Sequence, residues 1–138
     1  KIKKESSILV LGILIVEDDE AMVNIYKVWL RTTKSEIDIC DNSYDVSDKI
    51  KTGRIKEYQL LIVDLKLQGS EDGDKVVDQL SQVESENKEK TPIIFLSSEI
   101  NQEMQQKYGD MKNIKLLEKT SVNSEILRNQ ILEVIAGL

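Results

Sequence analysis

The chain has 138 residues, of which 40% are hydrophobic and 32% are charged, and its formal net charge is −6. This composition is typical of one globular domain, and the acidic balance argues against direct nucleic-acid binding, which depends mainly on basic residues that displace counterions. The sequence contains no histidine, which excludes internal Ser-His-Asp or Cys-His catalysis, an internal phosphohistidine relay and most zinc sites.

The longest apolar run, at residues 8–16, is much shorter than a membrane span and continues into Glu17 without a small-residue cleavage pattern. We therefore expect neither a transmembrane helix nor a signal peptide, and we expect a cytoplasmic location. Cys40 is the single cysteine. It is predicted to be a small buried hydrophobe rather than a reactive thiol.

The first half of the chain alternates between strand and helix patterns. The continuous apolar run 13–16 predicts a strand buried on both faces, whereas the alternating segment 36–41 predicts a sheet edge. Val46 and Ile50 mark a short helix, and the apolar run 60–63 predicts another buried strand. A one-sided helix between the first two strands is predicted by apolar residues at helical spacing, namely Met22, Ile25, Tyr26, Trp29 and Leu30.

The second half continues the same alternation. The charged stretch 84–90 is interpreted as the frayed end of a helix and a solvated loop, and it precedes the buried strand 93–96. The partly alternating segment 114–117 predicts the second sheet edge. Thr120 or Ser121 is available as the N-cap of the final helix. Three helices are predicted from their apolar spacing: Val76, Leu80 and Val83; Met104 and Tyr108; and Leu127, Ile131 and Val134.

Five strands alternating with five helices predict an α/β fold with a doubly wound, five-stranded parallel sheet of order 2-1-3-4-5. In this order the switch point lies between the first and third strands, at the carboxyl edge of the sheet. Glu17 and Asp18 follow the first strand, and Asp64 follows the third. The three carboxylates are therefore expected to meet in one crevice.

Converging carboxylates repel one another unless a cation lies among them, and ligands that are all oxygen favour Mg2+. Asp64 could then act as a nucleophile and form an acyl phosphate. Ser97, at the end of the fourth strand, offers a hydroxyl, and Lys119, after the fifth, offers an ammonium group.

Each of these residues also has a simpler explanation. Asp18 could belong to an acidic stretch, 18–20, that opens a helix, where the dipole favours negative charge. Asp64 and Ser97 could be caps of helices or turns, and Lys119 could be a solvated surface lysine. Their common position at one edge of the predicted sheet favours the functional interpretation.

Four segments, in this order and at these separations, resemble the motifs of response-regulator receiver domains: 13–19, 60–64, 91–98 and 116–119. The resemblance covers residues from about 13 to 135. It implies a flavodoxin-like receiver fold, with residues 13–138 as the receiver domain and residues 1–12 as an N-terminal extension or linker.

The resemblance also implies roles for single residues. Asp18 would bind Mg2+ directly, Glu17 would help through water, and Asp64 would be both a metal ligand and the phospho-acceptor. The backbone carbonyl of Lys66 would complete the metal ligands supplied by the protein. Two further residues, Ser97 and Lys119, would contact the phosphoryl group.

Members of the family are switches of two-component or phosphorelay systems rather than enzymes with an external substrate. The phosphoryl donor would be a sensor histidine kinase or a histidine phosphotransfer protein, which fits a chain without histidine. A downstream output domain or protein would read the modified surface. The resemblance is also compatible with a homodimer.

The chain departs from the family pattern at several positions. The proline usually found four residues after the acceptor is Gln68, and segment 69–73 makes the following loop one residue longer than usual. Thr120 replaces the usual cis-proline, so we expect a rearranged loop after Lys119. Leu116 replaces a Tyr or Phe switch, which predicts that the signal leaves through the loop after Ser97 and the fourth helix.

Two other functions fit parts of the pattern. One is a Mg2+-dependent phosphohydrolase, but haloacid-dehalogenase-like phosphatases usually carry a second Asp two residues after the nucleophile, where this chain has Lys66. The other is a receiver-like scaffold that binds partners without phosphorylation. The complete acidic set together with Ser97 and Lys119 argues against it.

Overall fold

The computed structural model describes residues 3–5, 8–67, 72–85 and 89–136. Five parallel strands form the central sheet in the order β4-β3-β5-β6-β7. This is the predicted order 2-1-3-4-5. The strands are β3 (Gly12–Val16), β4 (Glu36–Cys40), β5 (Leu60–Asp64), β6 (Ile93–Ser97) and β7 (Ile114–Glu118).

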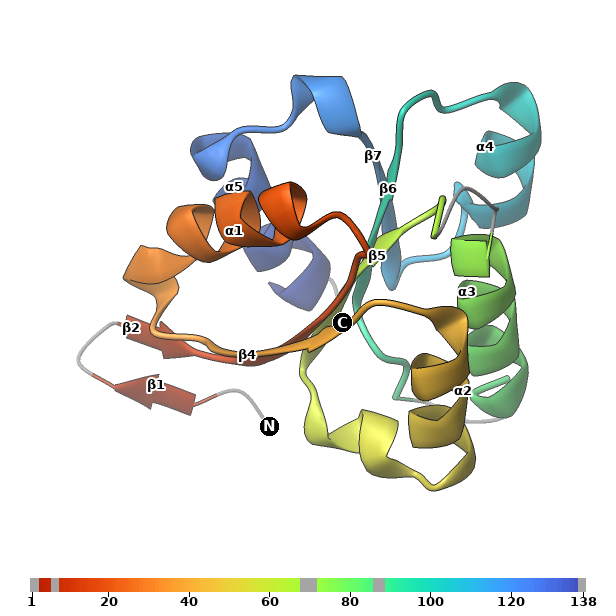
Figure 1. The fold of residues 1–138 in the computed structure, drawn as a ribbon, viewed down its shortest axis with the longest axis horizontal. Coiled ribbons are helices and arrows are strands. Elements are labelled where there is room, and N and C mark those ends of the chain that lie inside the picture. The colour runs from red at the N-terminus through yellow and green to blue at the C-terminus, as the bar shows by residue number, and fades with distance from the viewer. Residues whose placement is uncertain (1–2, 6–7, 68–71, 86–88, 137–138) are drawn as a thin grey trace.

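Two helical layers cover the sheet (Figure 1). Helices α1 (Glu20–Trp29) and α5 (Ser124–Ala136) lie on one face. Helices α2 (Ser43–Lys51), α3 (Asp72–Val83) and α4 (Gln102–Tyr108) lie on the other. Three short 3-10 helices join these elements: η1 (Arg31–Thr33), η2 (Arg54–Glu57) and η3 (Lys119–Ser121). No helix in the described ranges has the length and apolar composition needed to cross a bilayer.

The two cores divide the side chains of each central strand by alternation. Ile13 and Ile15 face α1 and α5, whereas Leu14 and Val16 face the other helical layer. Because successive side chains of a strand point to opposite faces, this alternation also fixes the direction of the residues that follow each strand. Cys40 is buried in the second of these cores, as predicted.

An antiparallel hairpin precedes the sheet and was not predicted. Strand β1 (Lys3–Glu5) pairs with β2 (Ile8–Val10), which leads into β3 after a single residue, Leu11. The sequence shows one apolar run through β2 and β3. The apolar pattern therefore does not show where the hairpin ends and the central sheet begins.

The apolar faces of two helices differ from the prediction. Ile25 is 38% exposed, and the buried positions of α1 are Val23 and Tyr26. On α3, Val83 is 56% exposed, whereas Val76 and Leu80 are buried. The predicted positions Tyr26, Val76 and Leu80 are buried, whereas Ile25 and Val83 are not. The sheet behind each helix selects the contact face, and apolar spacing alone does not fix its margins.

Glu84 corrects the interpretation of the charged stretch 84–90. It is 1% exposed rather than solvated. Its carboxylate accepts hydrogen bonds from the backbone N–H of Thr91 at 3.1 Å and from the Thr91 hydroxyl at 2.7 Å, and it pairs with Lys56. A buried charge needs such partners, and here they close the loop between α3 and β6. Residues 86–88 lie outside the described part.

Helix α5 confirms its predicted face but corrects its cap. Leu127, Ile131 and Val134 are all buried. Thr120 and Ser121 lie in η3, and the Asn123 side chain accepts the hydrogen bond from the Ile126 N–H at 2.9 Å. Asn123 therefore caps α5.

Candidate functional site

The sheet places two buried carboxylates on the same side. Glu17 follows β3, and Asp64 ends β5. In both strands the odd–even alternation directs these side chains toward the face covered by α1 and α5, since Ile15 and Ile62 face that layer. Glu17 is also held by its backbone N–H, which donates to the Cys40 carbonyl at 3.0 Å.

Three carboxylates and one ammonium group form the site. Glu17, Asp18 and Asp64 each offer an oxygen atom, and these atoms all lie within 4.8 Å of one another. Glu17 is 1% exposed and Asp64 5%, while Asp18 is more exposed. Lys119 Nζ lies 2.8 Å from Asp64 Oδ2 and 3.2 Å from Glu17 Oε1. The predicted convergence of these four side chains is confirmed.

Burial and crowding of negative charge change the protonation of the site. Burial, together with the hydrogen bond and the negative charge of Asp64, raises the pKa of Glu17 from 4.5 to about 7. Burial alone lowers the pKa of Lys119, but its hydrogen bond to Asp64 and the two carboxylate charges outweigh burial and raise that pKa. Lys119 therefore stays charged, whereas Glu17 gains or loses its proton near pH 7.

The acidic stretch 18–20 serves two purposes. Asp19 is the N-cap of α1, because its carboxylate accepts the Ala21 N–H at 3.0 Å. Glu20 lies in the first turn, where the helix dipole favours its charge. Asp18 instead belongs to the carboxylate cluster. The helix-opening explanation thus accounts for Asp19 and Glu20 but not for Asp18.

Two fixed donors orient the Asp64 carboxylate. Lys119 donates to Oδ2, and the backbone N–H of Lys66 donates to Oδ1 at 3.3 Å. The bond from Lys66 places its backbone beside the cluster, while the predicted role of its carbonyl as a metal ligand remains a prediction.

Ser97 lies at the same edge but makes other contacts. It ends β6 and is buried. Its hydroxyl donates to the Glu99 carbonyl at 2.7 Å and accepts from the Glu99 N–H at 3.3 Å. These bonds fix the first turn of the loop between β6 and α4. The predicted contact of Ser97 with a phosphoryl group remains a prediction.

Gly73 is a residue of the site region that no sequence pattern predicted. It lies in the first turn of α3 and donates its N–H to the Leu65 carbonyl at 3.0 Å. A Cβ atom at this position would lie 2.0 Å from the Asp64 carbonyl oxygen. Glycine thus allows α3 to pack directly on the backbone of β5 at Asp64. The only sequence signal was its position in the acidic loop after Asp64.

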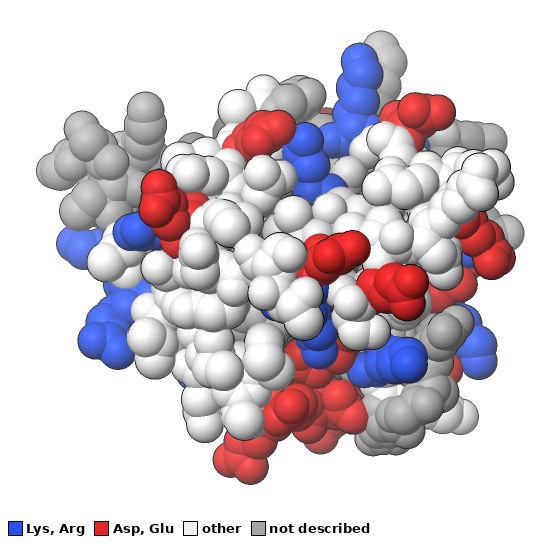
Figure 2. Space-filling model, turned by 90° about the horizontal axis from the view of Figure 1, so that it is seen from above, with Lys and Arg blue, Asp and Glu red and all other residues white. Residues whose placement is uncertain are grey.

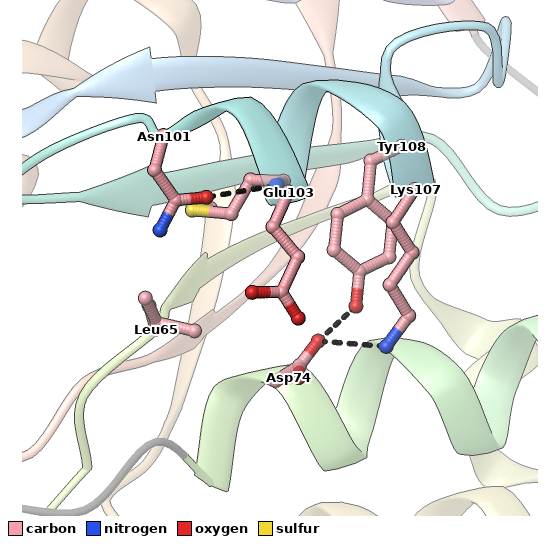
Figure 3. Close-up of a pocket in the computed structure, with 7 residues that line it drawn as sticks. Leu65, Asp74, Asn101, Glu103, Lys107 and Tyr108 are labelled. Atoms are coloured by element: carbon pink, nitrogen blue, oxygen red, sulfur yellow. Dashed lines mark hydrogen bonds and ion pairs between the residues drawn. The ribbon is translucent and has the colours of Figure 1, made fainter.

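A second polar group joins α4 to α3 beside the acceptor loop (Figure 3). The Tyr108 hydroxyl donates to carboxylates of Asp74 and Asp78, the latter at 2.8 Å. Lys107 Nζ pairs with Asp78 at 2.7 Å and Asp74 at 3.3 Å. We call these four residues the α3–α4 clamp. It borders a pocket of about 70 Å³ that Leu65, the residue after Asp64, also lines.

Of the positions that depart from the family pattern, Leu116 and Thr120 lie in the described part of the structure. None of the peptide bonds in the described ranges is cis, and Thr120 lies in η3 directly after the lysine. Leu116 is partly buried against the core on the α2–α4 face. Gln68 and residues 69–71 lie outside the described residues.

The sequence model of the family described as response regulator receiver domain matches residues 13–131. The chain belongs to this family. Receiver domains are signalling domains that accept a phosphoryl group rather than enzymes in the usual sense, and they generally bind Mg2+ at an acidic pocket. No curated protein sequence matches this chain.

Solved receiver domains share the fold. A signal receiver domain of a Vibrio parahaemolyticus protein described as a Luxo repressor is 23% identical, with a TM-score of 0.74 over 93% of this chain and 92% of that chain. The signal receiver domain of a modulated diguanylate cyclase from Desulfovibrio desulfuricans G20 is 22% identical, with a TM-score of 0.68 and coverages of 92% and 94%. The BeF3-activated receiver domain of Klebsiella pneumoniae RstA is 18% identical, with a TM-score of 0.67 and coverages of 89% and 97%.

The donor set of this receiver domain fits Mg2+. All the side-chain ligands are carboxylate oxygens, as a hard divalent cation requires. If every group is ionised, three carboxylates and one ammonium leave two negative charges in excess, which one divalent cation neutralises. Glu17 Oε1 is buried without a hydrogen-bond partner among the described residues, so an oxygen atom remains available for a metal-bound water or another donor.

The raised pKa of Glu17 predicts how stability depends on pH in the metal-free protein. The folded state binds this proton more tightly than the unfolded chain, so its stabilising effect is complete below pH 4.5 and is lost as pH rises through about 7. Relative to Glu17→Gln, the wild type should lose on the order of 3 kcal/mol over this interval, since one pKa unit is worth about 1.4 kcal/mol. Urea unfolding in EDTA measures the difference, and parallel pH profiles would contradict it.

Gly73→Ala should destabilise the receiver domain by roughly 1 to 3 kcal/mol, because the added methyl group displaces the Asp64 backbone. Helix propensity acts in the opposite direction, since alanine is normally better than glycine within a helix by about 1 kcal/mol. The control is Ser81→Ala on the same helix, which should be neutral or stabilising. A Gly73→Ala variant as stable as the control would mean that α3 does not pack tightly on β5.

Proposed function

We propose that this receiver domain accepts a phosphoryl group on Asp64 in a Mg2+-dependent reaction with a partner phosphohistidine. One observation carries the proposal. The Asp64 carboxylate is buried among two further carboxylates and is held by Lys119 at 2.8 Å. A structural carboxylate at a strand end requires neither the additional acids nor the buried ammonium group.

In this reaction an Asp64 oxygen forms a bond to phosphorus, and the bond between phosphorus and the partner's imidazole nitrogen breaks. The electron pair of that bond returns to the nitrogen. Lys119 and the Lys66 N–H hold the carboxylate in a fixed orientation for the attack, so the protein contributes mainly positioning.

A cation would be held by Asp18 and Asp64, by Glu17 through water, and by the Lys66 carbonyl. When bound, it would neutralise charge on the phosphoryl oxygens. Lys119 pairs with both Asp64 and Glu17, so its ammonium group would contact a phosphoryl group added to Asp64. Ser97 would contact that group after its hydroxyl leaves the Glu99 backbone.

The partners that we propose are a sensor histidine kinase or histidine phosphotransfer protein as donor, and an output domain or protein as reader. A cytoplasmic location and a homodimer belong to the same proposal. Direct nucleic-acid binding does not. On the face drawn in Figure 2, the described Lys and Arg side chains lie singly or in small groups among Asp and Glu side chains and form no continuous basic patch.

Asp64→Asn should abolish phosphorylation and keep the fold, because the amide has nearly the same shape but lacks the charged nucleophilic oxygen. The experiment is incubation with Mg2+ and a small acyl-phosphate or phosphoramidate donor, followed by intact-mass measurement. Wild type and the exposed control Asp110→Asn should gain the mass of one phosphate. Omission of Mg2+ should suppress this gain.

Uptake of phosphate by Asp64→Asn at unchanged stoichiometry would contradict the acceptor assignment. A wild-type protein that gains no mass would favour the phosphorylation-independent scaffold, and continuous release of phosphate from the donor would favour the phosphohydrolase.

The signal is expected to leave through the loop after Ser97 and α4, and the α3–α4 clamp opposes movement of that helix. Loading Asp64 with beryllofluoride should change amide hydrogen exchange mainly in residues 98–110. Tyr108→Phe removes only the clamp hydroxyl, so it should enlarge this change and destabilise the protein by about 1 kcal/mol. Exchange changes centred on Leu116, with a quiet α4, would contradict this route.

A further inference from the structure

Two buried side-chain oxygen atoms lack a hydrogen-bond partner among the described residues, the Tyr26 hydroxyl and Glu17 Oε1. Both side chains are only 1% exposed. Glu17 Oε1 lies 3.2 Å from Lys119 Nζ, which is an ion pair without hydrogen-bond geometry. Buried hydroxyl groups in native proteins nearly always have a partner, so two such atoms within one domain raise the question of whether they serve each other.

Tyr26 lies on the face of the sheet toward which the acidic site projects. It packs in the core formed with Ile13, Ile15 and Ile62. The alternation of β3 and β5 directs Glu17 and Asp64 toward this same face. Tyr26 and the carboxylates therefore approach one another from the helix and from the strand ends.

The direction of α1 brings the phenol toward the site. The helix begins at Glu20, just after the acidic residues at the carboxyl edge, and runs away from them. Side chains of a helix lean toward its N-terminus. The Tyr26 ring thus extends back toward the site, and an edge-to-face contact with Trp29, with ring centroids 5.9 Å apart, holds the ring.

Electrostatics agree with this placement. The pKa of Tyr26 is raised, first by burial and then by the negative charges of Glu17 and Asp64. The hydroxyl consequently lies within the field of both carboxylates and remains protonated, which makes it a hydrogen-bond donor.

We propose that Tyr26 is a positioning residue whose hydroxyl donates a hydrogen bond to a bridging water on the Glu17 carboxylate and so fixes Glu17 for cation binding. The inference rests on the proposed function for the role of the cation, but the hydrogen bond itself does not require phosphorylation. It assigns a polar role to a side chain that helical spacing had marked only as part of a buried apolar face.

The test is Tyr26→Phe, which removes the hydroxyl and keeps the ring. In metal-free protein the equilibrium constant for unfolding should rise about fivefold to tenfold, as expected for one lost hydrogen bond. The Mg2+ dissociation constant, measured by calorimetric titration with MgCl2, should rise severalfold. An unpartnered hydroxyl predicts the opposite sign for stability, because its removal relieves an unsatisfied polar group.

Tyr58→Phe is the matched control. Tyr58 is also buried and donates its hydroxyl hydrogen bond to Asp38 at 2.6 Å, but it packs in the core on the other face of the sheet. This variant should lose stability without a change in Mg2+ affinity, which separates a general loss of packing from an effect on the acidic site.

A double-mutant cycle with Glu17→Gln decides the pairing. If the hydroxyl acts through the carboxylate, the effects of Tyr26→Phe and Glu17→Gln on metal-free unfolding and on Mg2+ affinity should be non-additive. Additive effects, or a Tyr26→Phe variant at least as stable as wild type with unchanged Mg2+ affinity, overturn the proposal. Failure of Asp64 phosphorylation would instead overturn the proposed function and leave the metal-free coupling intact.

Discussion

The contact between Lys119 and the buried carboxylates is the interaction on which the rest of the site depends. Lys119 Nζ reaches Asp64 and Glu17 from the end of β7, so it joins an edge strand to the two central strands that carry the acids. Without this ammonium group the carboxylates would lack the only cation paired with them in the described residues. Lys119 offsets the burial of these carboxylates only in part, because burial and the charge of Asp64 still raise the pKa of Glu17. The folded domain therefore carries an electrostatic cost, which a bound divalent cation would relieve, and binding would then stabilise the sheet edge.

The backbone around Asp64 is constrained as closely as its side chain. Gly73 brings the first turn of α3 onto the Asp64 carbonyl, and the Leu65 N–H continues the sheet by donating to the Leu96 carbonyl at 2.8 Å. The Asp64 backbone is therefore held by a helix on one side and by β6 on the other. Such preorganisation suits a reaction in which positioning supplies most of the catalysis. A change at Asp64 therefore meets α3 and β6 through the backbone, and it meets Lys119, which directly follows β7, through the side chain.

Sequence patterns predicted the sheet order and the convergence of Glu17, Asp18, Asp64 and Lys119, because parallel strands with apolar runs place their following residues at one edge. They failed where tertiary contacts choose between equivalent local patterns. Val83 has the correct spacing for a buried position, yet Glu84 is buried instead, because Thr91 and Lys56 supply partners from distant segments. Gly73 shows the same limit, because glycine is needed there only to avoid a clash with the backbone of Asp64 in β5. Tyr26 was predicted as part of a helix face, but nothing in the spacing shows where its hydroxyl lies.

Leu116 stands where many family members have an aromatic switch, so the polar contacts of α4 become the candidate route for the signal. Leu116 packs against the core and has no hydroxyl to exchange partners, so its rearrangement would lose apolar contacts without a compensating hydrogen bond. Ser97 already holds the start of the loop that leads to α4, through two bonds to the Glu99 backbone. Tyr108 and Lys107 hold the end of the same helix through α3, whose first turn rests on Asp64. The loop before α4 and the end of α4 are thus held by hydrogen bonds to β6 and α3, which both contact β5. A change at Asp64 can reach α4 through either connection, so the clamp offers a route to this helix that needs no aromatic residue on β7.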